Sequence, residues 1–314
     1  MENILINIDS RYRNKNKYPN PGLFVYNLPD PIKNVSSIRL ASIELPLTFY
    51  TFTESYQNIN FYIQAADITI TDASNNLITI PGDTYEIIIK EGNYTSDYLV
   101  NYIQEMLNVY NNANGLNFSV SWDNINYKIT FKNVNPFSLK FGINNAKTPL
   151  GYYLGFRNTD DSYDINKVTQ PTISENGQTI YYWNSDTFLD STKEEYAFVR
   201  INDYNIINNI IINSEDVVVT KNNEQYLKST SIIKAKPILA KIILYDGQFV
   251  FDNGANFLTK EYKFKNPVNL SRLEIELFLP NGYTINMNQI DYSLTLEIGQ
   301  IYDSRNYENY NFKV

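Results

Sequence analysis

The densest acidic patch of the chain is a group of oxygen-bearing side chains that lie close together in the sequence: Asn158, Asp160, Asp161 and Asp164. Carboxylate and amide oxygens are the ligands that hard cations such as Ca²⁺ prefer. The patch lacks the regular spacing and the closing bidentate glutamate of a calcium-binding loop, and a solvated acidic loop is the simpler interpretation. We therefore predict no metal site, and the binding of a cation by this patch stays an open question.

The chain contains no histidine and no cysteine. This excludes Ser-His-Asp and Cys-His catalysis, imidazole bases, and zinc held by imidazole or thiolate ligands. It has neither a Walker motif nor a G-x-G-x-x-G phosphate loop. Two carboxylates can carry out glycoside hydrolysis, but no such pair is marked out by its sequence context. We predict a protein without catalytic residues or cofactor, with a carboxylate-based glycosidase as a remote alternative.

A short basic segment near the N-terminus stands out because the whole chain has a net charge of −8 and a pI of about 4.8. It contains Arg11, Tyr12, Arg13, Lys15 and Lys17. Such a segment can contact phosphates or an acidic protein surface, and a solvated arm is the alternative. Proteins that coat nucleic acid are usually basic, so we expect contacts with neighbouring proteins and no direct nucleic-acid role.

The end of the sequence is a second candidate for contacts, because it is rich in Tyr and Asn. Its candidate interaction residues are Tyr302, Arg305, Tyr307, Tyr310 and Phe312. Tyrosine combines an apolar ring with a polar hydroxyl and is therefore suited to wet interfaces. Segments of this kind that become ordered on assembly can span large surfaces.

Alternation of apolar and polar residues with a period of two is the dominant pattern. It is clear in Leu273–Leu277 and in Tyr292–Ile298, and turn residues such as Pro280-Asn281-Gly282 separate such runs. This pattern is typical of antiparallel sheets with one face on a core and one in water. We predict a mainly β protein with a jelly-roll-like antiparallel β-sandwich core.

One segment follows a helical period. In residues 96–110 the apolar side chains recur at offsets of three and four, which predicts an amphipathic helix. The longest apolar stretches, near Ile206–Ile212 and Ile238–Tyr245, fall well short of the ~20 residues that a membrane-spanning helix needs. We therefore expect no transmembrane segment.

We expect the helix to belong to a small α+β module inserted into the β-sandwich. The predicted division of the chain is an N-terminal arm and strands in residues 1–63, the inserted module in 64–157, an irregular loop or linker in 158–196, C-terminal strands in 197–303 and a tail in 304–314.

Several blocks of sequence carry a resemblance to a known family. They are Ile6–Arg13, Phe24–Pro29, Pro31–Leu40, Ile43–Pro46, Tyr50–Phe52, Glu91–Thr95, Leu154–Phe156, Phe198–Asn202, Pro267–Leu273 and Asp291–Leu296. Together they resemble the minor capsid and vertex structural proteins of nucleocytoplasmic large DNA viruses (giant viruses) and their Polinton-like relatives. The opening block is the most specific of them. The family supplies no catalytic residues to carry over.

The resemblance implies a minor capsid protein that is made in the host cytoplasm and is located in the virion. Its partners would be the major capsid protein or other minor capsid proteins, and a symmetric homo-oligomer is compatible with it. A penton (vertex) protein and a receptor- or glycan-binding fibre protein are the alternatives. For the fibre protein, exposed Tyr and Trp side chains in residues 158–196 would stack on sugars.

Overall fold

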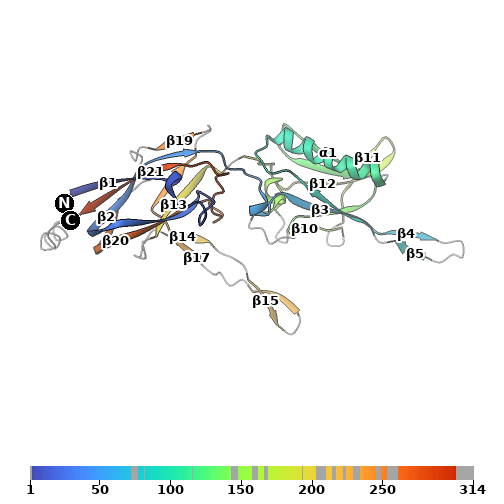
Figure 1. Ribbon diagram of the computed structural model, residues 1–314. Coiled ribbons are helices and arrows are strands. Elements are labelled where there is room, and N and C mark those ends of the chain that lie inside the picture. The colour runs from blue at the N-terminus through green and yellow to red at the C-terminus, as the bar shows by residue number, and fades with distance from the viewer. Residues whose placement is uncertain are drawn as a thin grey trace. The chain divides into compact units, whose positions relative to one another are not determined.

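The computed structural model describes residues 2–71, 77–80, 82–114, 116–142, 148–157, 162–165, 169–192, 194–202, 210–213, 217–221, 224–228, 234–244, 249–252 and 261–301. The chain divides into two compact units (Figure 1). Unit 1 comprises Met1–Phe49 and Glu194–Val314, and unit 2 comprises Tyr50–Lys193. Unit 2 is continuous in sequence and lies between the two segments of unit 1; it includes residues 50–63 and residues 158–193 of the predicted linker.

Seven strands of unit 1 form one antiparallel sheet with the order β1-β21-β2-β20-β13-β18, and β19 pairs with β2 beside this path (Figure 1). The strands are β1 (Glu2–Asp9), β2 (Leu23–Pro46), β13 (Tyr196–Asn202), β18 (Ala240–Ile243), β19 (Phe249–Asp252), β20 (Tyr262–Phe278) and β21 (Ser293–Gln300). Strands from both ends of the chain therefore alternate in the sheet.

Strand β2 makes this sheet curl. Its register against β20 shifts at three places between Asn27 and Ser37, and such irregularities bend a strand and increase its twist. The first part of β2 pairs with β20, whereas the part from Val35 to Glu44 pairs with β21 along its other edge. The curled sheet gives the mainly β, jelly-roll-like sandwich that the alternation predicted.

The period of two decides which side chains form the core of unit 1. On β21, Leu294, Leu296 and Ile298 are buried, as predicted from their alternation with polar residues. Strand β20 departs from the pattern because Glu276 is buried too. Its carboxylate pairs with Arg200 Nε of β13 at 2.9 Å and accepts a hydrogen bond of 2.7 Å from the Thr284 hydroxyl. The ion pair offsets the cost of removing this charge from water.

Unit 1 also contains two separate strand pairs (Figure 1). They are β14 (Ile210–Asn213) with β17 (Lys234–Pro237), and β15 (Val217–Lys221) with β16 (Glu224–Lys228).

Unit 2 contains two four-stranded antiparallel sheets and a hairpin. The first sheet has the order β10-β9-β3-β6, the second has the order β11-β12-β8-β7, and β4 pairs with β5. The strands are β3 (Asn60–Ala65), β4 (Ile68–Thr71), β5 (Leu77–Ile80), β6 (Thr84–Ile88), β7 (Ser119–Trp122), β8 (Ile129–Asn133), β9 (Phe137–Lys140), β10 (Ser162–Tyr163), β11 (Thr172–Glu175) and β12 (Gln178–Asn184).

Strands β10 to β12 lie within residues 158–196, for which the sequence predicts an irregular loop or linker. The structure corrects this expectation: β12 pairs with β8, and Trp183 is buried opposite Phe131. The Trp183 indole N–H donates to the Phe137 carbonyl at 3.0 Å. These strands are short and mostly polar, so their sequence has no clean alternation to reveal them.

The predicted amphipathic helix is confirmed as α1 (Ser96–Asn114). Leu99, Ile103 and Leu107 on one face are buried in the core of unit 2. Two polar side chains also join the helix to β7 and to the residue that precedes it. Gln104 Oε1 accepts a hydrogen bond from Val120 N at 2.7 Å, and Asn111 Oδ1 accepts one from Phe118 N at 2.9 Å. This helix therefore packs within its own unit.

Three short helices are also found among the described residues: η1 (Ser10–Tyr12), η2 (Glu54–Tyr56) and α2 (Leu150–Tyr153). Among the described residues, no helix has both the length and the apolar character that crossing a membrane requires.

We predict that Ile103→Ala destabilises unit 2 by about 2–5 kcal/mol, because it removes a fully buried side chain and leaves a cavity. Both tryptophans, Trp122 and Trp183, lie in unit 2, so denaturant unfolding followed by tryptophan fluorescence reports on this unit. Val109→Ala on the exposed face of α1 is the matched control. Equal midpoints for the two variants would contradict the assignment of the buried face.

Candidate interaction surface

The basic segment forms a tight turn between β1 and β2, and its first residues are held by Asp9. Asp9 Oδ1 accepts a hydrogen bond from Arg11 N at 2.9 Å and so caps η1. Asp9 Oδ2 accepts from Arg11 Nε at 2.8 Å. These side-chain hydrogen bonds and the guanidinium charge lower the pKa of Asp9 below its usual value. Arg11 is therefore fixed by its neighbour although its side chain is 66% exposed.

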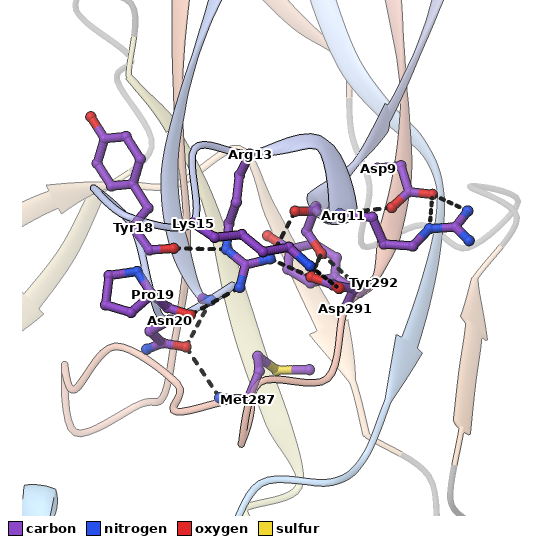
Figure 2. Close-up of polar contacts among 12 residues, drawn as sticks. Asp9, Arg11, Arg13, Lys15, Tyr18, Pro19, Asn20, Met287, Asp291 and Tyr292 are labelled. Carbon is purple, nitrogen blue, oxygen red and sulfur yellow. Dashed lines mark hydrogen bonds and ion pairs between the residues drawn. The ribbon is translucent and has the colours of Figure 1, made fainter.

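Arg13 lies at the centre of the turn, with a side chain that is only 3% exposed (Figure 2). Its guanidinium donates to three main-chain carbonyls: Nε to Tyr18 at 2.8 Å, Nη1 to Ser10 at 2.8 Å and Nη2 to Pro19 at 2.9 Å. Nη1 also forms an ion pair with Asp291. The planar fork of an arginine offers several donors at fixed angles, which a lysine cannot match. The turn is thus folded around this one side chain.

The turn is joined to the residues that precede β21. Ser10 N donates to the Tyr292 carbonyl at 2.9 Å, and Tyr292 N donates to Ser10 Oγ at 2.8 Å. Ser10 Oγ in turn donates to Asp291 Oδ1 at 3.0 Å. The ring of Tyr292 is buried against Phe24, and burial raises the pKa of its hydroxyl well above its usual value.

Asn20 fixes the point at which the chain leaves the turn for β2 (Figure 2). Its Nδ2 donates to the Ile285 carbonyl at 2.9 Å, and its Oδ1 accepts from Met287 N at 3.2 Å. The next position but one is Gly22, where a Cβ would lie 2.1 Å from the Ile285 carbonyl oxygen. A larger residue would therefore force the chain away from the Ile285 segment.

The structure separates the predicted interaction residues into two groups. Arg13 is not available to a partner, because its guanidinium is used inside the chain. Arg11, Tyr12, Lys15 and Lys17 are exposed, and Tyr12 is 76% exposed. We call these four exposed side chains the turn surface. They project from a turn that is folded and hydrogen-bonded, not from a solvated arm.

Most of the other predicted site residues cannot be placed in the structure. Tyr302, Arg305, Tyr307, Tyr310 and Phe312 lie outside the described residues, as do Asn158, Asp160 and Asp161. Asp164 is described, and in the part of the chain that can be described no group of three or more His, Cys, Asp or Glu side chains is placed to hold a metal ion.

A groove of about 540 Å³ lies beside the turn and is the feature that the sequence did not indicate. We call it the β1 groove. Its apolar lining comes from β1, β2, β20 and β21, and consists of Ile6, Ile8, Leu28, Pro29, Leu273 and Leu294. Asp9 and Glu44 add carboxylates, and Tyr12 of the turn surface is also part of the lining. The Tyr26 hydroxyl, in the first part of β2, donates to the Asp9 carbonyl at 3.2 Å and joins β2 to β1 there. Because these residues are distant in sequence, no local pattern reveals the groove.

The model of a family described as "Family of unknown function (DUF5901)" matches residues 1–236 of the 314 residues. The chain belongs to this family. The matched region includes β1, the turn and β2, whereas Asp291 and Tyr292, which hold the turn, lie beyond it.

No curated protein matches the chain. Among solved structures, the chain is similar to the crystal structure of the mavirus penton protein, with 8% sequence identity and a TM-score of 0.41. That alignment covers 96% of this chain and 100% of the mavirus protein.

We predict that Arg13→Met destabilises unit 1 by about 3 kcal/mol, because Asp291 loses its buried ion-pair partner and keeps the more distant Lys15 Nζ at 3.6 Å, and because three carbonyls lose their donor. Hydrogen exchange of the amides in residues 10–20 should accelerate in the same variant. Lys17→Met, which removes an exposed charge from the same turn, is the control. If both variants exchange and unfold alike, the turn does not depend on Arg13.

Proposed function

We propose that this protein is a non-enzymatic structural component of a large DNA virus capsid, a minor capsid protein that contacts neighbouring capsid subunits. The observation that carries the proposal is the place of the sequence block that most resembles virion structural proteins, Ile6–Arg13. That block forms the end of an edge strand and the start of a rigid turn, and it places Arg11 and Tyr12 in solvent. This surface, the sandwich faces and the C-terminal tail then contact other subunits.

A rigid turn suits lattice contacts for a physical reason. Residues that are already ordered lose little conformational entropy when a partner binds, so more of the contact energy remains as affinity. Tyrosine and arginine are enriched at protein interfaces, and the turn surface offers both. A symmetric particle repeats each weak contact many times, and linked contacts reinforce one another.

We predict that the chain is a component of purified particles. Quantitative mass spectrometry of particles treated with protease and nuclease should find it at a constant ratio to the major capsid protein. Its presence only in the soluble fraction of infected cells would overturn the proposal.

Light scattering of the purified full chain then distinguishes between the two capsid positions. A discrete closed ring such as a pentamer favours the vertex, and a monomer favours a minor protein that assembles only on the lattice.

A second candidate function, binding of a receptor or glycan, is favoured by a stack of tyrosines at the start of α1. The rings of Tyr94 and Tyr98 have centroids 5.8 Å apart with 22° between their planes, and Tyr98 and Tyr102 follow at 6.4 Å and 25°. Tyr98 is 61% exposed. Burial raises the pKa of Tyr94 to about 12. This stack replaces residues 158–196 as the candidate, because Trp183 is buried there.

We predict that, if this second function operates, the full chain binds defined oligosaccharides on a glycan array and Tyr98→Ala abolishes the signal. The physical reason is that the exposed ring offers a flat apolar face with a polar edge. Tyr127→Ala removes another exposed tyrosine of unit 2 and is the control. An array without signal for the wild-type chain would remove this candidate.

A further inference from the structure

We propose that the β1 groove is a docking site for residues Tyr310–Val314 of a second copy of this chain, which add as an antiparallel strand to the free edge of β1. The inference rests on the proposed function for its setting, in which many copies or neighbours are brought together. It names one partner and one mode of contact that the proposed function leaves unspecified.

One edge of β1 is open among the described residues. This strand is at the end of the sheet order, and within the described residues only β21 pairs with it. Because Ser10 N bonds to the Tyr292 carbonyl, the antiparallel alternation directs the main-chain groups of Ile4, Ile6 and Ile8 to β21. Those of the intervening residues are then directed to the open edge.

Within the described residues, the edge of β1 lacks the lysine, proline and bulges that commonly protect an edge strand. Edge strands are normally shielded by lysine, proline or a bulge, because their unpaired N–H and C=O groups attract further strands. Glu2–Asp9 contains no lysine, arginine or proline, and its pairing with β21 is in continuous register. Leu5 is 62% exposed on this strand. An added strand would cover both the edge and the apolar groove beside it.

The sequence of residues 310–314 suits the β1 groove. Residues 310–314 read Tyr-Asn-Phe-Lys-Val, so the three apolar side chains fall on one face of a strand and Asn311 and Lys313 on the other. Strand addition of this kind takes its affinity from main-chain hydrogen bonds and its specificity from alternate side chains in a groove. The groove therefore selects for the apolar face of the tail, and Phe312 is at the centre of that face.

Strand direction favours the tail of a second copy over the chain's own tail. Gln300 pairs with Glu2, so the chain leaves β21 at the beginning of β1. A tail that returned along the edge of its own β1 would run parallel to that strand. Every strand pair described in this structure is antiparallel, and parallel pairing is slightly less stable per residue. The tail of another copy can enter in the antiparallel direction.

The test uses the absence of cysteine from the chain. Full-length Leu5→Cys and Asn311→Cys chains are mixed under mild oxidation, and cross-linked products are separated by non-reducing electrophoresis and identified by mass spectrometry. We expect a heterodimer joined at residues 5 and 311. Adding Phe312→Asp to the Asn311→Cys chain should abolish the heterodimer, because it places a charge on the face that enters the groove. Adding Lys313→Asp instead changes the charge on the opposite face, and this matched control should leave most of the heterodimer.

Each outcome decides the proposal. A heterodimer that Phe312→Asp removes supports docking between copies. A Leu5→Cys/Asn311→Cys double variant that cross-links only within one chain overturns it in favour of the chain's own tail, and no cross-link above that of a Tyr127→Cys control overturns it altogether. Normal incorporation of Phe312→Asp into particles without the cross-link would overturn the docking alone, whereas absence of the wild-type chain from particles would overturn the proposed function alone.

Discussion

The central constraint on this structure is that β2 pairs with C-terminal strands along both of its edges. Val35 and Ile38 lie opposite residues of β20 on one side and of β21 on the other, more than 200 positions later in the sequence. Unit 1 therefore cannot form until both ends of the chain are brought together. Loop closure costs only slowly more as a loop lengthens, so the inserted unit 2 adds little to this cost.

Unit 2, which is inserted between the paired strands of unit 1, has a hydrophobic core of its own. Its two sheets and α1 enclose a cluster of buried aromatic and aliphatic side chains, in which Phe61 lies against Phe131 and Phe141. Edge-to-face and tilted ring pairs of this kind add to the energy of apolar burial. Much of the aromatic richness of the sequence thus has a structural use in unit 2.

The buried guanidinium of Arg13 shows how a polar side chain can set local structure. Removing an arginine from water is costly, and an ion pair with Asp291 alone does not repay it well. Three carbonyl acceptors in the turn add further hydrogen bonds to the guanidinium. The arrangement favours one conformation of the turn, because any other would leave the charge poorly paired.

The sequence predicted the features that depend on local periodicity and missed those that depend on distant residues. The buried face of β21 and the helix at Ser96 followed from periods of two and of about 3.6. The role of Arg13 did not, because a basic run looks the same whether its members face solvent or the carbonyls of their own turn. The boundary at Phe49 and the strands around Trp183 were also missed, since pairing partners and not composition determine them.

The position of the turn relative to the open edge of the sheet connects these features. Asp9 ends β1, caps η1 and lines the β1 groove, so the edge strand, the rigid turn and the groove share one residue. The hydrogen bond from Tyr26 to the Asp9 carbonyl holds β2 against the same point. A strand that docked along β1 would therefore meet a surface that is already ordered at one end. Preorganisation of this kind lowers the entropy cost of docking, and it would favour a strand that fits both the eight-residue edge and the groove over other strands that an open sheet edge attracts.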